Sequence, residues 1–428
     1  MDTFMVNKRV LMIAYHYPPM RGSSGIQRTL KFSQYLPQSG WNPVVLSAHP
    51  RAYTNPGDDQ MGDIPSSVPV RRAFALDASR HLAFKGRYLG FTALPDRWAT
   101  WWLGAVPAGL SMIRSYRPSV LWSTYPIATA HLIALALHKM TGLPWVADLR
   151  DPMTDVGHPA HALTRKAYLW IEKQTIRHCT KAVCTTPGAI NTYEKRFPEI
   201  PRERFCLIEN AYDEENFADA ERELAIGGAV KRDGPLTLVH SGVIYPSERD
   251  PGPLFAALAE LQRQGVLTPA NFRLVLRATG HDDYVGAMVR EHGIDGIVQL
   301  APHVPYRTAL TEMLTSDGLL ILQAENCNHQ VPAKLYEYLR AGRPILALTD
   351  AAGDTAATLR RAGIDTIAPL DDKDGIMAGL RRFIALVADG AAPLASQQTV
   401  AANSRRARSE QLALLLDQVA TAHQLRTK

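Results

Sequence analysis

The sequence is poor in cysteine and has no long uninterrupted apolar run. Its four cysteines form neither a Cys-x-x-Cys pair nor a set with zinc-ligand spacing. We therefore expect no disulfide framework and a reducing, cytoplasmic location. A strongly apolar stretch such as residues 126–137 is shorter than the ~18–20 residues that cross a membrane. The first residues lack a small-residue cleavage site, so we expect no signal peptide.

Motifs that define several nucleotide-dependent and hydrolytic enzymes are also missing. No G-x-G-x-x-G follows a predicted strand, and neither a G-x-x-x-x-G-K-[ST] loop nor a G-x-S-x-G turn occurs. These absences argue against a dinucleotide oxidoreductase, a P-loop enzyme and a hydrolase with a serine nucleophile elbow.

The composition is that of an ordinary folded, globular protein. Of the 428 residues, 46% are hydrophobic and 21% are charged, which excludes a largely disordered or collagen-like chain. At ~150 residues per domain, the length predicts two or three domains. The net charge of +6 is compatible with an anionic partner such as a nucleotide or a phospholipid surface. A mild positive charge alone does not support a nucleic-acid partner, and we expect none.

Short β-type runs alternate with longer amphipathic segments along the chain. This alternation indicates βαβ units and a mostly parallel sheet, and nearly continuous runs of Val, Ile and Leu are typical of strands buried on both faces. The predicted strands are residues 10–14, 43–47, 120–123, 145–148, 182–185, 205–209, 236–240, 272–277, 297–300, 318–322, 345–348 and 366–368.

The alternation pauses over residues 218–235, which are polar and contain glycine. We interpret this segment as a linker between an N-terminal domain (1–217) and a C-terminal domain (236–400). A last amphipathic helix, over about 401–423, lies in the terminal segment 401–428. The predicted fold class is α/β, with two Rossmann-like, doubly wound domains.

A segment from Arg71 to Trp102 mixes basic and aromatic residues, and all seven tryptophans lie in the first predicted domain. Two interpretations stay open. The segment is a pair of surface helices whose aromatic side chains pack into the core, or it is a patch that contacts an acceptor or an anionic membrane surface.

Three candidate features lie in the first domain. The loop after the first strand contains Gly22 and Ser23, and glycine there would let backbone N–H groups approach an anion. Asp151 follows the strand 145–148, where carboxylates of a parallel sheet face the ligand crevice. His131 opens an apolar helical run. Each also has a structural explanation: turn chemistry, a helix cap and a packed core histidine.

The matching loop of the second domain runs from residue 240 to residue 251. Asp250 suits a helix N-cap and Pro251 the first helical position. The backbone amide of Gly242 would then face a phosphate, and the Arg249 guanidinium would bind the same anion. The alternative is a surface arginine beside a capped helix.

The most informative segment surrounds Lys334. Pro332 can open a helix and Gly342 can close it, so Lys334 and Glu337 share one face near the helix start. A lysine at a helix N-terminus favours a diphosphate, and a carboxylate one turn later can accept from the vicinal hydroxyls of a ribose. The alternative is an ion pair on a solvated face.

These motifs together resemble a retaining glycosyltransferase of the GT-B fold, in the group called family 4 or glycosyl transferases group 1. The resemblance covers nearly the whole chain. It rests on the segments YHYPPMRGSSGIQRTLKFSQYL, PWVADLRDP, IENAYDEENF, HSGVIYPSERDP and VPAKLYEYLRAGRPIL. It implies two domains facing across a cleft, with the acceptor mainly on the first, the nucleotide-sugar donor mainly on the second, and a last helix that returns to the first domain.

The resemblance also implies roles for individual residues. Gly242, Arg249 and Lys334 would bind the donor diphosphate, with Arg249 and Lys334 acting in catalysis, and Glu337 would bind the ribose. In the first domain, Gly22 and Ser23 would lie near the phosphates or the acceptor, and Asp151 would border the acceptor side with a catalytic role. We also place His131 on the acceptor side.

One residue departs from the family pattern. The family carries two glutamates spaced E-x7-E, the second matching Glu337, whereas this sequence has His329 in the first position. That glutamate normally lies near the transferred hexose, so His329 is a donor-binding candidate whose presence leaves the identity of the sugar open.

We therefore expect transfer of a sugar, with retention, from a nucleotide-diphosphate sugar to a hydroxyl of a saccharide or lipid-linked acceptor. The expected setting is cell-surface polysaccharide or glycolipid synthesis in the cytoplasm, or peripherally at the inner membrane face. We expect no metal and no cofactor beyond the nucleotide-sugar co-substrate. A nucleotide-sugar epimerase of the same fold and a non-catalytic nucleotide-sugar-binding protein remain the alternatives.

Overall fold

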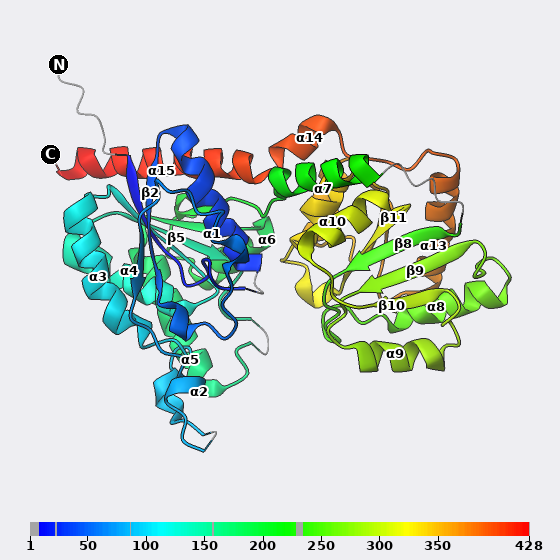
Figure 1. The fold of residues 1–428 in the computed structure, drawn as a ribbon, viewed down its shortest axis with the longest axis horizontal. Coiled ribbons are helices and arrows are strands. Elements are labelled where there is room, and N and C mark those ends of the chain that lie inside the picture. Colours follow the sequence, from blue (N-terminus) through cyan, green and yellow to red (C-terminus); the bar gives the residue numbers. More distant parts are fainter. Residues whose placement is uncertain (1–7, 22–23, 86, 156–157, 228–233, 428) are drawn as a thin grey trace. The chain divides into compact units, whose positions relative to one another are not determined.

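The computed structural model describes residues 8–21, 24–85, 87–155, 158–227 and 234–427. The chain divides into two compact units (Figure 1). Unit 1 comprises Met1–Glu209 and Arg405–Lys428, and unit 2 comprises Asn210–Ser404. Each unit contains one parallel sheet flanked by helices, so the predicted fold class of two Rossmann-like units is confirmed.

The sheet of unit 1 has seven strands in the order β3-β2-β1-β4-β5-β6-β7, and every neighbouring pair is parallel. The strands are β1 (Arg9–Ile13), β2 (Asn42–Ala48), β3 (Val70–Ala73), β4 (Val120–Thr124), β5 (Trp145–Arg150), β6 (Lys181–Cys184) and β7 (Phe205–Leu207).

The helices of unit 1 include the last helix of the chain. They are α1 (Ser24–Tyr35), α2 (Ala78–His81), α3 (Trp101–Tyr116), α4 (Ala128–Thr141), α5 (Ala162–His178), α6 (Pro187–Arg196) and α15 (Arg405–Thr427). Short 3-10 helices are η1 (Leu36–Ser39), η2 (Pro50–Ala52), η3 (Asp58–Gln60), η4 (Gly90–Ala93) and η5 (Arg202–Arg204). The predicted return of the last helix to the first domain is confirmed, because α15 belongs to unit 1 and packs against α1.

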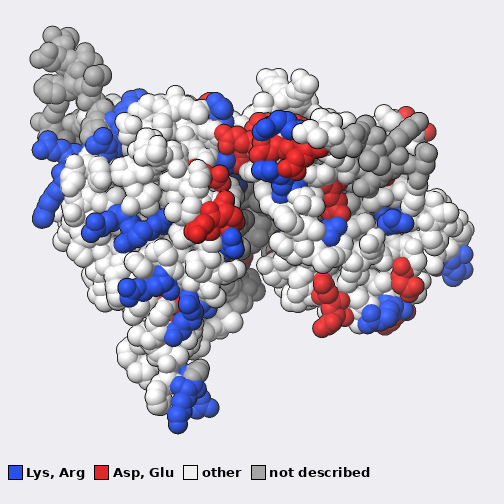
Figure 2. All heavy atoms as spheres, in the orientation of Figure 1, with Lys and Arg blue, Asp and Glu red and all other residues white. Residues whose placement is uncertain are grey.

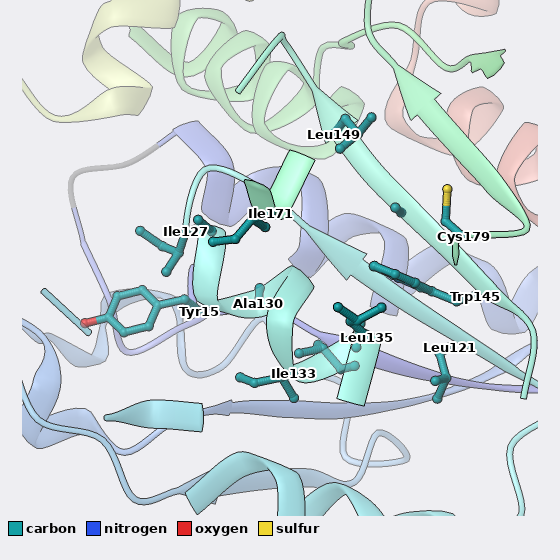
Figure 3. Packing of buried hydrophobic residues seen from close by; sticks show 14 of the residues in the cluster. Tyr15, Leu121, Ile127, Ala130, Ile133, Leu135, Trp145, Leu149, Ile171 and Cys179 are labelled. Carbon is teal, nitrogen blue, oxygen red and sulfur yellow. The ribbon is translucent and has the colours of Figure 1, made fainter. Parts of the chain in front are cut away.

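The apolar runs of the strands supply two cores, one on each face of the sheet. Successive side chains of a strand point to opposite faces. In β1, Leu11 and Ile13 join the core beneath α3 and α4, while Val10 and Met12 join the core beneath α1 and α15. Figure 3 shows part of the first core, where Trp145 and Leu121 from neighbouring strands lie beside Leu135 of α4.

The segment from Arg71 to Trp102 is not the expected pair of surface helices. It forms the edge strand β3, the four-residue helix α2 and the 3-10 helix η4. Its aromatic residues divide into two groups: Trp101 is fully buried against Tyr15, whereas Phe84 and Phe91 are 79% and 70% exposed. The packing interpretation is thus wrong for Phe84 and Phe91. In Figure 1 the region around α2 projects from the rest of unit 1.

The sheet of unit 2 has six parallel strands in the order β10-β9-β8-β11-β12-β13. They are β8 (Leu236–Ser241), β9 (Phe272–Arg277), β10 (Val298–Ala301), β11 (Gly318–Gln323), β12 (Ile345–Thr349) and β13 (Ile367–Ala368). The helices are α7 (Glu214–Gly227), α8 (Gly252–Arg263), α9 (Asp282–Glu291), α10 (Tyr306–Thr315), α11 (Lys334–Ala341), α12 (Asp354–Arg361), α13 (Lys373–Ala388) and α14 (Gln397–Ala402), with the 3-10 helix η6 (Glu325–Cys327).

Helix α7 occupies the first half of the segment that we predicted to be a linker. The polar character of this stretch belongs to the outer face of a helix, whose other face buries Phe217 within unit 2. Arg340 of α11 forms ion pairs with Glu214 at 2.6 Å and with Glu221 at 2.8 Å, which fasten α7 to the unit. The first unit accordingly ends at Glu209, before α7. Residues 228–233 lie outside the described residues.

A buried ion pair joins α1 to the centre of the first sheet. The Arg28 guanidinium donates to both carboxylate oxygens of Asp148, at 2.8 and 2.9 Å, and both residues are at most 2% exposed. The same guanidinium donates to the carbonyl oxygens of Ile208 and Glu209, and Thr124 donates its hydroxyl to Asp148 at 2.8 Å. Asp148 therefore has a structural role.

Removing one partner of this pair should strongly destabilise unit 1. We expect Arg28→Met to lower the free energy of unfolding by about 3–5 kcal/mol, because it leaves the Asp148 carboxylate buried without a countercharge. Tryptophan fluorescence during urea unfolding reports on unit 1 alone, since all seven tryptophans lie in it.

The control is Lys8→Met, because Lys8 pairs with Asp417 at 2.9 Å while both side chains are more than a third exposed. That variant should lose less than about 1 kcal/mol. The double variant Arg28→Met/Asp148→Leu should recover part of the loss. Equal losses for Arg28→Met and Lys8→Met would contradict the role that we assign to the buried pair.

Candidate functional site

In both units the strand order reverses beside the first strand, between β1 and β4 in unit 1 and between β8 and β11 in unit 2. Loops leaving the carboxyl ends of such strands diverge and open a ligand crevice. The candidate residues from the sequence lie largely on these loops.

Gly242, directly after β8, brings the backbone close to Lys334. Its φ of +118° is unfavourable for other residues, and a Cβ atom built there would lie 3.0 Å from the Lys334 Nζ. Its N–H donates to the Arg277 carbonyl at 2.8 Å. The prediction that this amide faces a phosphate is therefore wrong, because the amide continues the pairing of β8 with β9. The role of Gly242 is to leave room for the lysine.

Lys334, the first residue of α11, contacts His240, the penultimate residue of β8. The Lys334 Nζ lies 3.1 Å from Nε2 of His240, and Nδ1 of His240 lies 2.9 Å from the Leu320 carbonyl oxygen. A carbonyl only accepts, so Nδ1 carries the proton and Nε2 accepts from the ammonium. Burial lowers the pKa of His240 well below its usual value, with Lys334 adding to the effect, which keeps the imidazole neutral.

The surroundings of Lys334 disfavour the charged form of its side chain. Burial and, to a smaller extent, the Arg249 guanidinium lower its pKa to about 7, although the Glu337 carboxylate partly opposes this change. The three charged side chains therefore lie close enough to influence one another. Two cations face one carboxylate here, so the group has excess positive charge and is suited to an anion.

Arg249 is held by the loop that carries it. Its Nη1 donates to the Val243 carbonyl at 2.6 Å, and its guanidinium lies over the Tyr245 ring, 5.4 Å from the centroid. Both are neutral partners, so the positive charge remains available. Helix α8 begins at Gly252 with Pro251 as its cap, one residue later than predicted, and Asp250 accepts from the Gly252 amide.

Glu337 lies one turn into α11, on the side of Lys334. Its Oε1 accepts a hydrogen bond of 2.7 Å from the hydroxyl of Tyr306, the first residue of α10. The tyrosine holds the carboxylate at the edge of the site. The expected helix boundaries are close to those observed, with α11 ending before Gly342 in the left-handed conformation.

His329 lies in the loop between β11 and α11 and is half-buried. Gln323 fastens this loop, because its Nε2 donates to the carbonyls of Cys327 at 2.8 Å and Gln330 at 3.1 Å. The Gln330 side chain lies 3.4 Å from Nε2 of His329. A cavity of about 480 Å³ lies beside this loop. Its lining includes Asp250 and Glu325 but neither Arg249 nor His329.

In unit 1, the corresponding edge carries Asp151 and two residues that we did not single out, His16 and Arg150. Asp151 accepts from the Thr185 hydroxyl at 2.9 Å. Arg150 has a φ of +63°, where the register of β5 with β6 shifts, and donates to the Tyr125 carbonyl at 3.4 Å. Burial and the nearby Arg150 lower the pKa of His16 to about 4, so His16 is neutral at pH 7.

His131 does not belong to this edge. It is fully buried in the core, and its Nδ1 lies 2.8 Å from the Ser123 hydroxyl, which in turn accepts from the indole nitrogen of Trp145. Burial lowers its pKa to about 4. The packed-histidine interpretation is the one that the contacts support. Gly22 and Ser23 lie outside the described residues.

Sequence reasoning missed His240 and Tyr306 in unit 2, and His16 and Arg150 in unit 1. Three of them had a usable signal, since His240, His16 and Arg150 stand at the carboxyl ends of parallel strands. Tyr306 had none, because its contact with Glu337 joins residues 31 positions apart. Among the described residues, no cluster of three or more His, Cys, Asp or Glu side chains is arranged to hold a metal ion.

Comparisons with known proteins agree with this architecture. The family model described as a glycosyl transferase 4-like domain matches residues 25–211. None of the curated proteins compared matches the chain in sequence. The structure is similar to that of a sucrose-phosphate synthase from Thermosynechococcus elongatus, with a TM-score of 0.69, 14% identity and coverage of 97% of this chain and 100% of the other.

Two further similar structures contain nucleotide sugars. Anabaena HepE in complex with UDP-glucose has a TM-score of 0.57 and 12% identity, over 98% of this chain and 100% of the other. A UDP-GlcNAc 2-epimerase from Neisseria meningitidis bound to UDP-GlcNAc has a TM-score of 0.56 and 11% identity, over 96% and 100%. Residues 25–211 thus match the glycosyl transferase 4-like domain model, and the whole chain has the GT-B fold that these structures share.

Proposed function

We propose that the protein transfers a sugar, with retention, from a nucleotide-diphosphate sugar to a hydroxyl group of a saccharide or lipid-linked acceptor. The observation that carries the proposal is the group formed by Arg249, Lys334 and Glu337 at the carboxyl edge of the unit 2 sheet. The similar HepE structure, which contains UDP-glucose, supports this class of donor.

The electrostatics of the group suit a departing diphosphate. When the bond between the anomeric carbon and the phosphate oxygen breaks, negative charge grows on the diphosphate. Arg249 and Lys334 would stabilise that charge, and removing one such contact typically costs about 2.7–4 kcal/mol of transition-state stabilisation. We propose that these cations neutralise the leaving group without a metal ion.

The neighbouring residues would orient the donor. Glu337, positioned by Tyr306, would accept hydrogen bonds from the two hydroxyls of the ribose. His329 would contact the transferred sugar, and its imidazole would favour a different pattern of sugar hydroxyls from that selected by a carboxylate. Asp151 would face the acceptor from unit 1.

Retention constrains the path of the proton. The new bond from the acceptor oxygen forms on the face of the anomeric carbon that the leaving oxygen vacates. The proton of the acceptor hydroxyl then passes to the departing phosphate oxygen, so atoms and charges balance without a protein nucleophile.

An epimerase is the second candidate, because one of the similar structures is a UDP-GlcNAc 2-epimerase. The two activities differ in their need for an acceptor. An epimerase inverts a carbon of the sugar in the nucleotide sugar alone, whereas a transferase releases the nucleoside diphosphate as it forms a glycoside.

Product analysis of the purified protein tests the proposal directly. Mass spectrometry and NMR should detect a glycoside of retained configuration and free nucleoside diphosphate when a panel of nucleotide sugars is supplied with saccharide and lipid-linked acceptors. We expect Lys334→Ala to lower kcat/KM at least 100-fold, because it removes a cation from the leaving group.

The matched control is Lys373→Ala, since Lys373 is also the first residue of a helix in unit 2 and is exposed. It should retain full turnover. An epimerised sugar formed without acceptor would replace the proposal by epimerisation. Binding of a nucleotide sugar without turnover of any acceptor would indicate a binding protein.

The lowered pKa of Lys334 makes donor binding depend on pH. The free site has a pKa of about 7 at Lys334, and a bound diphosphate should raise it by opposite charge. Binding of UDP-glucose should thus take up almost no proton at pH 6, should take up nearly one at pH 8, and should weaken as pH rises above 7. Calorimetry in buffers of different ionisation enthalpy measures this uptake.

Lys334→Arg provides the control for this experiment, because arginine stays protonated throughout the range. The variant should lose the proton uptake between pH 6 and pH 8. Unchanged uptake in Lys334→Arg would assign the titration to another group and contradict the role of Lys334.

We further propose that unit 1 contacts an anionic membrane surface, which would bring a lipid-linked acceptor to the protein at the inner membrane face. Phe84, Leu89 and Phe91 are 79%, 65% and 70% exposed, and the neighbouring Lys85 and Arg87 are exposed cations. Lys and Arg side chains gather at the tip of the projecting region in Figure 2. Among the described residues, no helix has both the length and the apolarity needed to cross a bilayer.

Co-sedimentation with vesicles tests this contact. Phe84→Ala/Phe91→Ala should reduce binding to phosphatidylglycerol vesicles at least tenfold, because two exposed aromatic rings no longer enter the interface. The control Leu394→Ala/Leu425→Ala removes two other exposed apolar side chains and should bind normally. Equal binding by both double variants would contradict the proposed surface.

A further inference from the structure

A second cavity lies in unit 1, at the edge of the sheet opposite to His16 and Asp151. Its volume is about 630 Å³. It is bounded by the start of β6, by the ends of α4 and α5, and by the last turns of α15. Because β5 spans six residues, the two edges of the sheet are about 20 Å apart.

The lining of this cavity is strongly basic. Among the described residues that line it, Glu203 is the one with a carboxylate. The permanently charged cations are Arg177, Lys181, Arg204 and Arg426, and three histidines, at positions 138, 178 and 423, line it as well. Val419 and Ala422 of α15 contribute an apolar wall.

The contacts of these cations leave their charge largely uncompensated. Arg204 donates to the carbonyls of Ile176 and Arg177 at 3.0 Å, and Lys181 donates to the carbonyl of Glu203. Carbonyls are neutral acceptors. Arg177 has an ionic partner, Glu199 at 3.1 Å, but both side chains are nearly half exposed, so the pair is weak.

The excess of positive charge affects the pKa of His178. Partial burial lowers its pKa, and the surrounding cations, among them Arg177 and Arg204, lower it further. Arg204 has a separate structural task, because it binds the last carbonyls of α5 and so stabilises the C-terminus of that helix. The side chains of Lys181, Arg177 and Arg426 take no part in this capping of α5.

We infer that this cavity is a binding site for a small phosphorylated molecule that carries at least two negative charges. Clustered guanidinium groups match the geometry of phosphate oxygens, and the volume is in the range of ligand pockets in proteins. The site is separate from the proposed catalytic edge and does not depend on the proposed activity. Because its walls come from α5 and α15, an occupant would stabilise unit 1 by bridging segments that are distant in sequence.

Calorimetric titration with inorganic pyrophosphate tests the inference. The full chain carrying Lys334→Ala/Arg249→Ala is used throughout, so that both cations of the unit 2 group are absent. Pyrophosphate should bind this protein and raise its melting temperature. Adding Arg177→Gln/Arg426→Gln should weaken the affinity at least tenfold, because two cations of the cavity are lost.

The matched control adds Arg114→Gln/Lys166→Gln, which removes two exposed cations of unit 1 outside the cavity. It should bind pyrophosphate normally. No binding to the Lys334→Ala/Arg249→Ala chain, or equal loss when either further pair of substitutions is added, would overturn the inference. A parallel arm uses phosphatidylglycerol vesicles: binding to vesicles that needs Arg177 and Arg426, without binding of pyrophosphate, would assign the cavity to a lipid headgroup and overturn a soluble ligand.

Discussion

The parallel direction of every paired strand is the constraint on which the rest of the structure depends. Parallel pairing places all carboxyl ends of a sheet at one edge, so that residues far apart in sequence meet there. His240, Arg249 and Lys334 are brought together in this way in unit 2, as are His16 and Asp151 in unit 1. The same constraint sends all amino ends to the opposite edge, where Lys181 and the residues after α5 surround the second cavity.

The chemistry of the unit 2 site follows from close packing of like charges. Gly242 allows the backbone to approach the Lys334 ammonium, and the neutral imidazole of His240 accepts from it, so a neutral partner holds the lysine. Such a site is electrostatically unfavourable when empty, and under the proposed function a bound diphosphate would relieve the repulsion. Buried groups with pKa values shifted in this way are typical of a functional site.

Much of this arrangement could be predicted from the sequence, and the failures have physical causes. The apolar runs predicted all twelve expected strands to within two residues at each end, and Pro332 and Gly342 located α11. The edge strand β3 was missed because it is only four residues long and two adjacent arginines form its middle, and α7 was mistaken for a linker because one of its faces is polar. The roles of single residues were harder to predict, because they depend on contacts between distant segments. The Gly242 amide donates to Arg277 of β9, and the His131 ring contacts Ser123, which accepts from Trp145.

The position of α15 has a consequence for biosynthesis. Its residues Leu412, Leu416 and Val419 complete the core on one face of the unit 1 sheet, although unit 2 is translated before them. During translation the first sheet emerges with that apolar face only partly covered, and it stays so until the last helix leaves the ribosome. Domains usually fold one after another from the N-terminus during synthesis. Here unit 2 can complete its fold before unit 1, because the core of unit 1 is complete only when α15 has packed against the sheet.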